Sequence, residues 1–274
     1  MLPCYKYTKF NEVGDFLQNN YRGTVFFDLD GTLLNAESKV DDSVAKAVHE
    51  LKENGYLPVI STGRSPIEIE AATSTTGIDT YITLNGAFVQ SQDKIIYQSN
   101  IKPELIKQLI DQTKEFGDSV SMHSPSESFL SEASPFVEEF YQAVNIDLPA
   151  VDPLYYQKDN VPMIVIVSEG DSDRYQEKFP ELKFYKTGPY SIDTVEKDIS
   201  KMSGIKHLIK GLKMEDKPVY AFGDGTNDLP MIKYADYGIA MGNGIDSVKA
   251  AATYVTTENV NGGIVNGLKH YNLI

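Results

Sequence analysis

Two aspartates close an apolar run near the start of the chain, in the stretch VFFDLDGTLLN of residues 25–35. Asp28 and Asp30 are two positions apart, so a strand that continued through them would present both side chains on the same side. Carboxylates this close favour different protonation states, because each negative charge raises the pKa of the other. One can then act as a nucleophile or metal ligand while the other moves a proton. The alternative interpretation is an ordinary strand that ends in an Asp-Gly turn.

A second acidic group lies in FGDGTNDLPM, residues 222–231. Asp224 follows an expected strand, and Asn227 and Asp228 fall in the first turn of the next expected helix. Asp228 alone could be an ordinary acidic residue at a helix N-terminus, where the helix dipole favours it. That interpretation explains Asp224, in its glycine-flanked turn, less well. Asp28 and Asp224 could together hold a hard cation such as Mg²⁺, which typically takes one or two carboxylates besides water and phosphate oxygens.

The elements that must position these residues follow a β-α-β rhythm at both ends of the chain. TVFFDLD, LPVISTGR and DTYITLNGA are strand-like segments separated by helical patterns, and the rhythm resumes around the strand KPVYAFGDG. This order predicts an α/β fold with a Rossmann-like parallel sheet covered by helices. In such sheets ligands bind outside the carboxyl ends of the strands. The polar residues expected at these strand ends are Asp28, Asp30, Ser61, Thr62, Arg64, Asn85 and Asp224.

The middle of the chain has a different pattern. Between about residues 86 and 189 a hairpin-like alternation is followed by short strands and helices, which predicts an α+β insert that forms a separate small domain. The core would then consist of residues 1–85 and 190–274. We also expect a short extra helix around Phe10–Leu17, laid on the core.

The composition argues against several classes of partner. The chain of 274 residues carries 25 Lys and Arg against 39 Asp and Glu, a net charge of −14. Such a surface repels nucleic acid and anionic lipid, and it would repel a phosphate-bearing substrate unless cations gather at the site. The single cysteine excludes an intrachain disulfide and a cysteine-built metal site. No apolar run approaches the roughly 20 residues of a membrane span, and the N-terminal segment lacks the pattern of a secretory signal. We therefore expect a cytoplasmic protein.

Four ordered motifs carry a resemblance to a known family. DLDGT, STGR, a downstream lysine and GDGTND resemble the haloacid dehalogenase superfamily of phosphatases. The long insert between the second and third motifs is similar to the C2B cap of the Cof-type subfamily. The resemblance spans about residues 24–274. It departs from the family in one respect, because the first aspartate is residue 28 whereas the family usually places it within about the first dozen residues.

The resemblance implies roles for the acidic residues. Asp28 would attack phosphorus and form an aspartyl-phosphate. Asp30 would protonate the leaving alcohol and then take a proton from the hydrolytic water. Mg²⁺ would be held by Asp28, the backbone carbonyl of Asp30 and Asp224, with support from Asp228 directly or through water.

The resemblance also implies residues that bind the phosphoryl group. Thr62 would donate a hydrogen bond to it, with Asn227 nearby. Lys201 has the place of the family's lysine just before a helix, although Met202 stands where a glycine is common. We expect Lys197, Lys206 and Lys210 to be solvated surface lysines. Arg64 could add positive charge, but we interpret it as a structural residue that pairs with a carboxylate of the core.

The function implied is that of a Mg²⁺-dependent phosphatase of small phosphorylated metabolites, sugar phosphates in particular. The small-molecule phosphate ester would be its partner, and the cap would close over it, exclude water and select the leaving group. Two alternatives stay open: a phosphotransferase or mutase on the same scaffold, and a regulator that binds a phosphorylated ligand.

Overall fold

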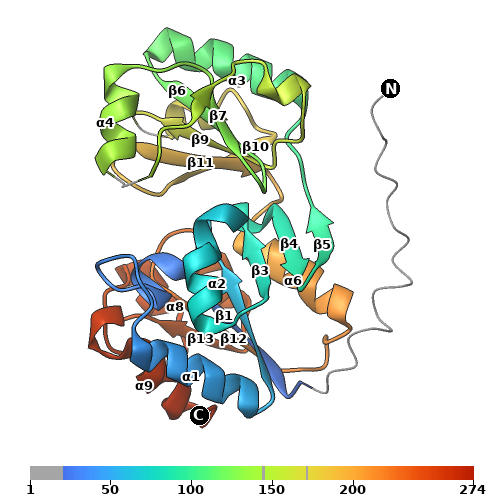
Figure 1. Ribbon diagram of the computed structural model, residues 1–274, viewed down its shortest axis with the longest axis vertical. Coiled ribbons are helices and arrows are strands. Elements are labelled where there is room, and N and C mark those ends of the chain that lie inside the picture. The colour runs from blue at the N-terminus through green and yellow to red at the C-terminus, as the bar shows by residue number, and fades with distance from the viewer. Residues whose placement is uncertain (1–20, 144–145, 171) are drawn as a thin grey trace.

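The computed structural model describes residues 21–143, 146–170 and 172–274, and it shows two lobes that each contain one sheet (Figure 1). The helix expected around Phe10–Leu17 lies outside the described residues. Among those residues, no helix combines the length and apolar character that crossing a membrane requires.

The lower lobe in Figure 1 contains an eight-stranded sheet of order β14-β13-β12-β1-β2-β3-β4-β5. The first six strands in this order run parallel to one another. Strand β4 pairs antiparallel with β3, and β5 pairs antiparallel with β4. The expected α/β fold with a parallel core is thereby confirmed. The parallel strands are β1 (Gly23–Phe27), β2 (Tyr56–Ser61), β3 (Thr80–Thr83), β12 (Val219–Gly223), β13 (Tyr237–Ala240) and β14 (Tyr254–Val255), and the antiparallel ones are β4 (Phe88–Ser91) and β5 (Lys94–Gln98).

Helices bury both faces of this sheet. Successive side chains of a strand point to opposite faces, and in β1 Val25 and Phe27 pack in one apolar cluster while Phe26 packs in another. Both faces are therefore apolar, as a buried parallel sheet requires. The first cluster includes residues of α1 (Asp42–Glu53), α2 (Glu70–Thr76) and α9 (Gly263–His270), and the second includes residues of α6 (Lys201–Leu212), α7 (Leu229–Tyr234) and α8 (Asp246–Ala251).

The upper lobe, which we call the cap, contains a six-stranded sheet of order β10-β11-β9-β6-β7-β8. Helices α3 (Pro103–Phe116) and α5 (Asp173–Gln176) pack on one face, and α4 (Pro135–Ala143) covers part of the other at Leu130 and Val167. The strands are β6 (Ser119–His123), β7 (Ser128–Leu130), β8 (Ala150–Val151), β9 (Met163–Val167), β10 (Leu182–Lys186) and β11 (Ser191–Glu196).

The change of sheet does not fall at the expected domain boundaries of 86 and 189. The expected boundaries place the hairpin of β4 and β5 in the insert, but this hairpin extends the core sheet, because β4 pairs with β3. Conversely β11 was assigned to the core, but it pairs with β9 and β10 in the cap. An apolar cluster joins the lobes, with Leu84 and Phe88 of the core against Met163 and Val195 of the cap.

Candidate active site

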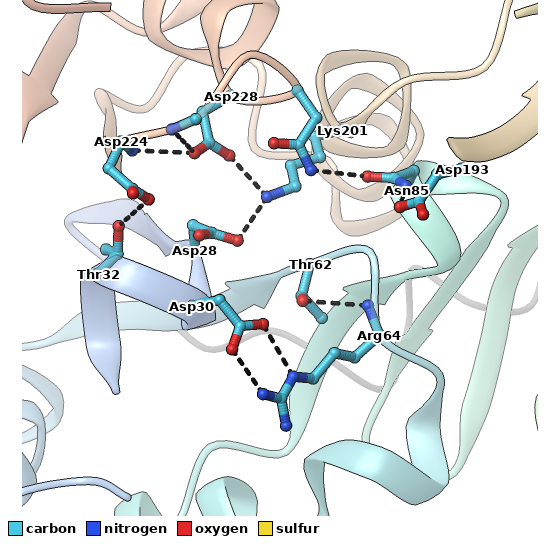
Figure 2. Close-up of polar contacts among 12 residues, drawn as sticks. Asp28, Asp30, Thr32, Thr62, Arg64, Asn85, Asp193, Lys201, Asp224 and Asp228 are labelled. Atoms are coloured by element: carbon cyan, nitrogen blue, oxygen red, sulfur yellow. Dashed lines mark hydrogen bonds and ion pairs between the residues drawn. The ribbon is translucent and has the colours of Figure 1, made fainter. Parts of the chain in front are cut away.

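The carboxyl ends of the central parallel strands bring the polar motifs together, as Figure 2 shows. Asp28 directly follows β1, Thr62 follows β2 and Asp224 follows β12, and these three strands are neighbours in the sheet. Asp228 directly precedes α7, and Lys201 begins α6. Asp28 and Lys201, which are 173 residues apart in the chain, therefore meet at one edge of the sheet.

Lys201 forms the centre of a buried ion-pair cluster. Its Nζ donates to Oδ1 of Asp28 at 2.5 Å and to Oδ1 of Asp228 at 2.6 Å, and its side chain is 0% exposed. Burial alone would lower the pKa of Lys201, but the two carboxylates outweigh it and raise that pKa. Burial and the charge of Asp228 raise the pKa of Asp28 well above its usual value, although Lys201 opposes them. The cluster is a desolvated set of charges that compensate one another.

Two glycines let α6 place Lys201 at this depth. Gly86 has a φ of +98°, and a Cβ on it would lie 2.0 Å from the carbonyl oxygen of Ser200. A Cβ on Gly204 would lie 3.1 Å from the Cα of Gly86. The start of α6 thus packs backbone to backbone against the turn after β3. The other candidate lysines, Lys197, Lys206 and Lys210, are exposed.

Asp224 and Asp228 are held by the turn between β12 and α7. Asp228 Oδ2 accepts the backbone N–H groups of Asp224 and Gly225, both at 2.9 Å, and Thr32 donates to Asp224 at 3.1 Å. Burial and the charge of Asp228 raise the pKa of Asp224 to about 6. Oxygen atoms of Asp28, Asp224 and Asp228 lie within 4.8 Å of one another. These three carboxylates could hold a divalent cation.

The DLDGT motif forms a turn at this edge and does not continue the strand. Strand β1 ends at Phe27, so the expected same-side geometry of Asp28 and Asp30 does not apply. Gly31 has a φ of +76°, and a Cβ on it would lie 2.4 Å from Oδ2 of Asp224. Glycine at this position therefore lets the first and last acidic motifs touch.

Asp30 points away from the buried cluster and pairs with Arg64. The guanidinium donates to both carboxylate oxygens, from Nε at 2.8 Å and from Nη2 at 2.5 Å (Figure 2). The Asp30 side chain is 57% exposed and that of Arg64 is 28% exposed. Arg64 does pair with a carboxylate of the core lobe, and this carboxylate borders the cavity above the site. The two aspartates of DLDGT thus have different environments, one buried and one accessible.

Thr62 and Asn227 are two core residues close to the cluster, and both line the cavity between the core and the cap. Thr62 is buried, and its Oγ1 accepts the backbone N–H of Arg64 at 3.2 Å. Asn227 donates to Asn85 at 3.0 Å, and Asn85 donates to Asp193 of the cap at 2.6 Å. Asn85 was expected at a strand end but was given no role, and nothing in the sequence pointed to Asp193.

A cavity of about 1040 Å³ separates this edge from the cap. Four of its lining residues, His123, Met163, Val165 and Asp193, lie on one face of the cap sheet, since they are opposite or two apart in the ladder. His123 is 8% exposed, and its Nε2 has no hydrogen-bond partner in the described part of the chain. Burial lowers the pKa of His123, although the core residue Glu68 opposes this shift, so the imidazole is neutral near pH 7.

Known proteins resemble the whole chain. Residues 25–268 match the haloacid dehalogenase-like hydrolase family. YkrA, a presumed phosphatase of Bacillus subtilis, is 31% identical over 91% of this chain and 98% of its own. A second B. subtilis protein, the 5-amino-6-(5-phospho-D-ribitylamino)uracil phosphatase YitU, is 27% identical over 90% of this chain and 96% of its own. The structure of the subclass IIB sugar phosphatase BT4131 superposes with a TM-score of 0.84 at 28% identity, covering 92% of this chain and 100% of that one.

Proposed function

Since the chain belongs to the haloacid dehalogenase-like hydrolases of the Cof type and is a phosphatase, we propose that it hydrolyses small phosphate monoesters, sugar phosphates in particular, through an aspartyl-phosphate on Asp28. The observation that carries this proposal is the pairing of Asp28 with Lys201 beneath the cavity. Only Oδ1 of Asp28 accepts from Lys201, at 2.5 Å. Its Oδ2 is then the oxygen that can attack phosphorus, while Lys201 supplies positive charge for the phosphoryl oxygens.

Asp30 is placed to move the protons of this reaction. In the first step Asp28 forms a bond to phosphorus, the ester P–O bond breaks, and protonated Asp30 gives its proton to the leaving alcohol oxygen. In the second step water attacks phosphorus, its proton passes to Asp30, and the bond from phosphorus to Asp28 breaks to release phosphate. Arg64 holds the Asp30 carboxyl at the edge of the cavity, where an ester oxygen can reach it.

The donor set fits Mg²⁺. Asp28, Asp224 and Asp228 offer carboxylate oxygens, which a hard divalent cation prefers. With Asp30 they make four carboxylates near two cations, Lys201 and Arg64, so full ionisation leaves an excess of two negative charges that Mg²⁺ would balance. When bound, the ion would neutralise charge on the phosphoryl oxygens. Asp28 and Asp224 would be its main ligands, because both oxygens of Asp228 already accept hydrogen bonds.

The cavity supports a hydroxylated leaving group. Its cap side carries the polar residues His123, Ser128, Thr187 and Ser191, which can bind hydroxyl groups. Thr62 and Asn227, at the core side, would donate to the phosphoryl oxygens. Two of the similar proteins are named for a sugar phosphatase activity and for a substrate with a phosphorylated ribityl chain, which agrees with such a pocket.

Phosphate release from a panel of sugar phosphates, nucleotides and p-nitrophenyl phosphate tests this function, with Mg²⁺ and with EDTA. We expect release that requires the metal and that Asp28→Asn abolishes. Full activity of Asp28→Asn would exclude the aspartyl-phosphate. Formation of an isomeric sugar phosphate without free phosphate would indicate a mutase, and saturable binding without turnover would indicate a regulator.

A further inference from the structure

A chain of side-chain hydrogen bonds joins the cap to the proposed phosphate site. Asp193 of the cap strand β11 accepts at Oδ2 from Asn85 Nδ2 at 2.6 Å. Asn85 Oδ1 in turn accepts from Asn227 Nδ2 at 3.0 Å. Figure 2 shows Asp193 and Asn85 side by side, on the far side of Lys201 from Asp224. We call these three residues the amide relay.

The direction of every bond in the amide relay follows from the carboxylate at its end. An ionised carboxylate can only accept hydrogen bonds. Asn85 must therefore turn its NH₂ group toward Asp193, which leaves its oxygen facing Asn227. Asn227 must then present its own NH₂ group, and one N–H of that group has no partner among the residues that the structure describes. An asparagine that lacked this partner could turn its oxygen toward a phosphate and repel it.

Buried contacts hold the Asp193 carboxylate in place, so it can set the direction of these hydrogen bonds. It is 8% exposed, and Thr187 donates to its other oxygen at 3.0 Å. It also packs on the turn that carries Thr62, because a Cβ on Gly63 would lie 3.0 Å from Asp193 Oδ2. The charged groups that act on it are Lys201 of α6, which attracts the carboxylate, and Glu68, which repels it.

We propose that Asp193 is a positioning residue that orients Asn227 through Asn85 and so completes the phosphate site only when the cap is seated on the core. This inference rests on the proposed function and extends it to the cap. Asp193 need not touch the substrate to act in this way. The orientation of the Asn227 amide then depends on Asp193, a residue of the other lobe. Enclosure of the substrate by the cap and binding of its phosphate are therefore coupled.

The test compares Asp193→Leu with Asp193→Asn. Leucine has similar size but no acceptor, whereas the oxygen of asparagine can still accept from Asn85 while its NH₂ group faces the hydroxyl of Thr187. We expect kcat for the best substrate of the panel to fall about tenfold to a hundredfold in Asp193→Leu, the effect of losing one oriented hydrogen bond to a charged group. We expect Asp193→Asn to keep most of the activity.

Asp118→Asn is the matched control for loss of a buried cap carboxylate. Asp118 is 5% exposed and is bonded to Arg174 and Tyr175, all within the cap. This variant should lower the melting temperature and leave kcat unchanged. An Asp193→Leu variant with wild-type kcat, or an Asp193→Asn variant as impaired as the leucine variant, would overturn the amide relay.

Binding of inorganic phosphate separates failure of the relay from failure of the proposed function. Calorimetric titration of orthophosphate with Mg²⁺ requires no turnover. We expect the Kd of orthophosphate to rise about tenfold in Asp193→Leu and little in Asp193→Asn. Equal Kd values in wild type and Asp193→Leu would refute the relay, whatever the wild type hydrolyses. Absence of turnover in a wild type that shows the expected Kd difference would refute the phosphatase and leave the relay standing.

Discussion

The polar groups on the two sides of the cavity differ in whether they already have hydrogen-bond partners. On the core side the acidic residues have partners within the core: Asp28 and Asp228 bind Lys201, Asp30 binds Arg64, and Asp224 accepts from Thr32. On the cap side, the buried Nε2 of the lining residue His123 has no hydrogen-bond partner within the residues that the structure describes.

This difference fits two tasks, in which the core side acts on the phosphate and the cap side recognises the leaving group. Groups that must act on a phosphate gain from being held in place before it arrives, since no energy is then needed to orient them during the reaction. Groups that recognise a leaving group must have hydrogen-bonding capacity left over, and a buried unpartnered atom provides it. Substitutions on the core side should therefore change kcat, and substitutions on the cap face should change KM, except at Asp193, which acts through the amide relay.

The largest effect is expected at the nucleophile. Asp28→Asn should reduce kcat about 10⁴-fold or more, because an amide does not form the acyl-phosphate and is a weaker ligand for a cation. The rate of phosphate release measures this loss. The melting temperature should stay close to that of the wild type, since the amide oxygen can still accept from Lys201. A loss below tenfold would contradict the role of Asp28.

Lys201→Met should destabilise the whole molecule. It leaves Asp28 and Asp228 buried without their cation, and breaking such a cluster typically costs about 3–5 kcal/mol. Denaturant unfolding measures the free energy of unfolding. Lys210→Met, at an exposed position of the same helix, is the control and should change it by less than about 0.5 kcal/mol. Equal effects of the two substitutions would mean that Asp28 and Asp228 do not need the charge of Lys201 in the folded protein.

Asp30→Asn should lower kcat about 10²- to 10³-fold for a sugar phosphate, because the leaving alcohol then lacks its proton donor. The loss should be smaller for p-nitrophenyl phosphate, whose leaving group departs as a stable anion. Comparing kcat for the two substrates tests the assignment. An equal loss for both would argue that Asp30 only positions Arg64.

The raised pKa of Asp193 predicts that the free energy of unfolding depends on pH. Burial raises its pKa from 3.8 to about 6, despite the hydrogen bonds from Asn85 and Thr187. The folded protein therefore binds this proton more tightly than the unfolded chain does. Its contribution to the free energy of unfolding is full below about pH 4 and is lost as the pH rises through about 6, an effect of about 3 kcal/mol.

Because Asp28 and Asp224 also have raised pKa values, the comparison must be made with Asp193→Asn. The difference in free energy of unfolding between wild type and this variant should change between pH 4 and pH 6 and be flat above about pH 7. A difference that is flat over the whole range would show that Asp193 titrates normally.

The smallest effect is expected on the cap face. His123→Ala should raise KM about threefold to tenfold for the preferred substrate, the value of one neutral hydrogen bond, with kcat nearly unchanged. His49→Ala, on the exposed surface of α1, is the control. A fall in kcat at constant KM would contradict the division between the two sides of the cavity.

Much of the catalytic edge could be predicted from short motifs. Asp28, Asp30 and Asp224 stand at strand ends or beside glycines, and Asp228 precedes a helix. The family resemblance selected Lys201 by its place before a helix. These are local features, because turn geometry and strand periodicity depend on neighbours in the chain. The parallel order of the sheet then brings the motifs to one edge.

The sequence by itself thus determined the parallel α/β core and the acidic motifs, and the resemblance to the family selected Lys201 among four lysines. Only the tertiary structure decided that Arg64 pairs with Asp30 and that Asp193 accepts a hydrogen bond from Asn85. It also decided that β4 and β5 belong to the core sheet and β11 to the cap sheet, opposite to the expected boundaries. A strand has the same alternation whichever sheet it joins, and its partner is selected by packing between distant segments. Asn85 and Asp193 are 108 residues apart, so no local pattern could have connected them.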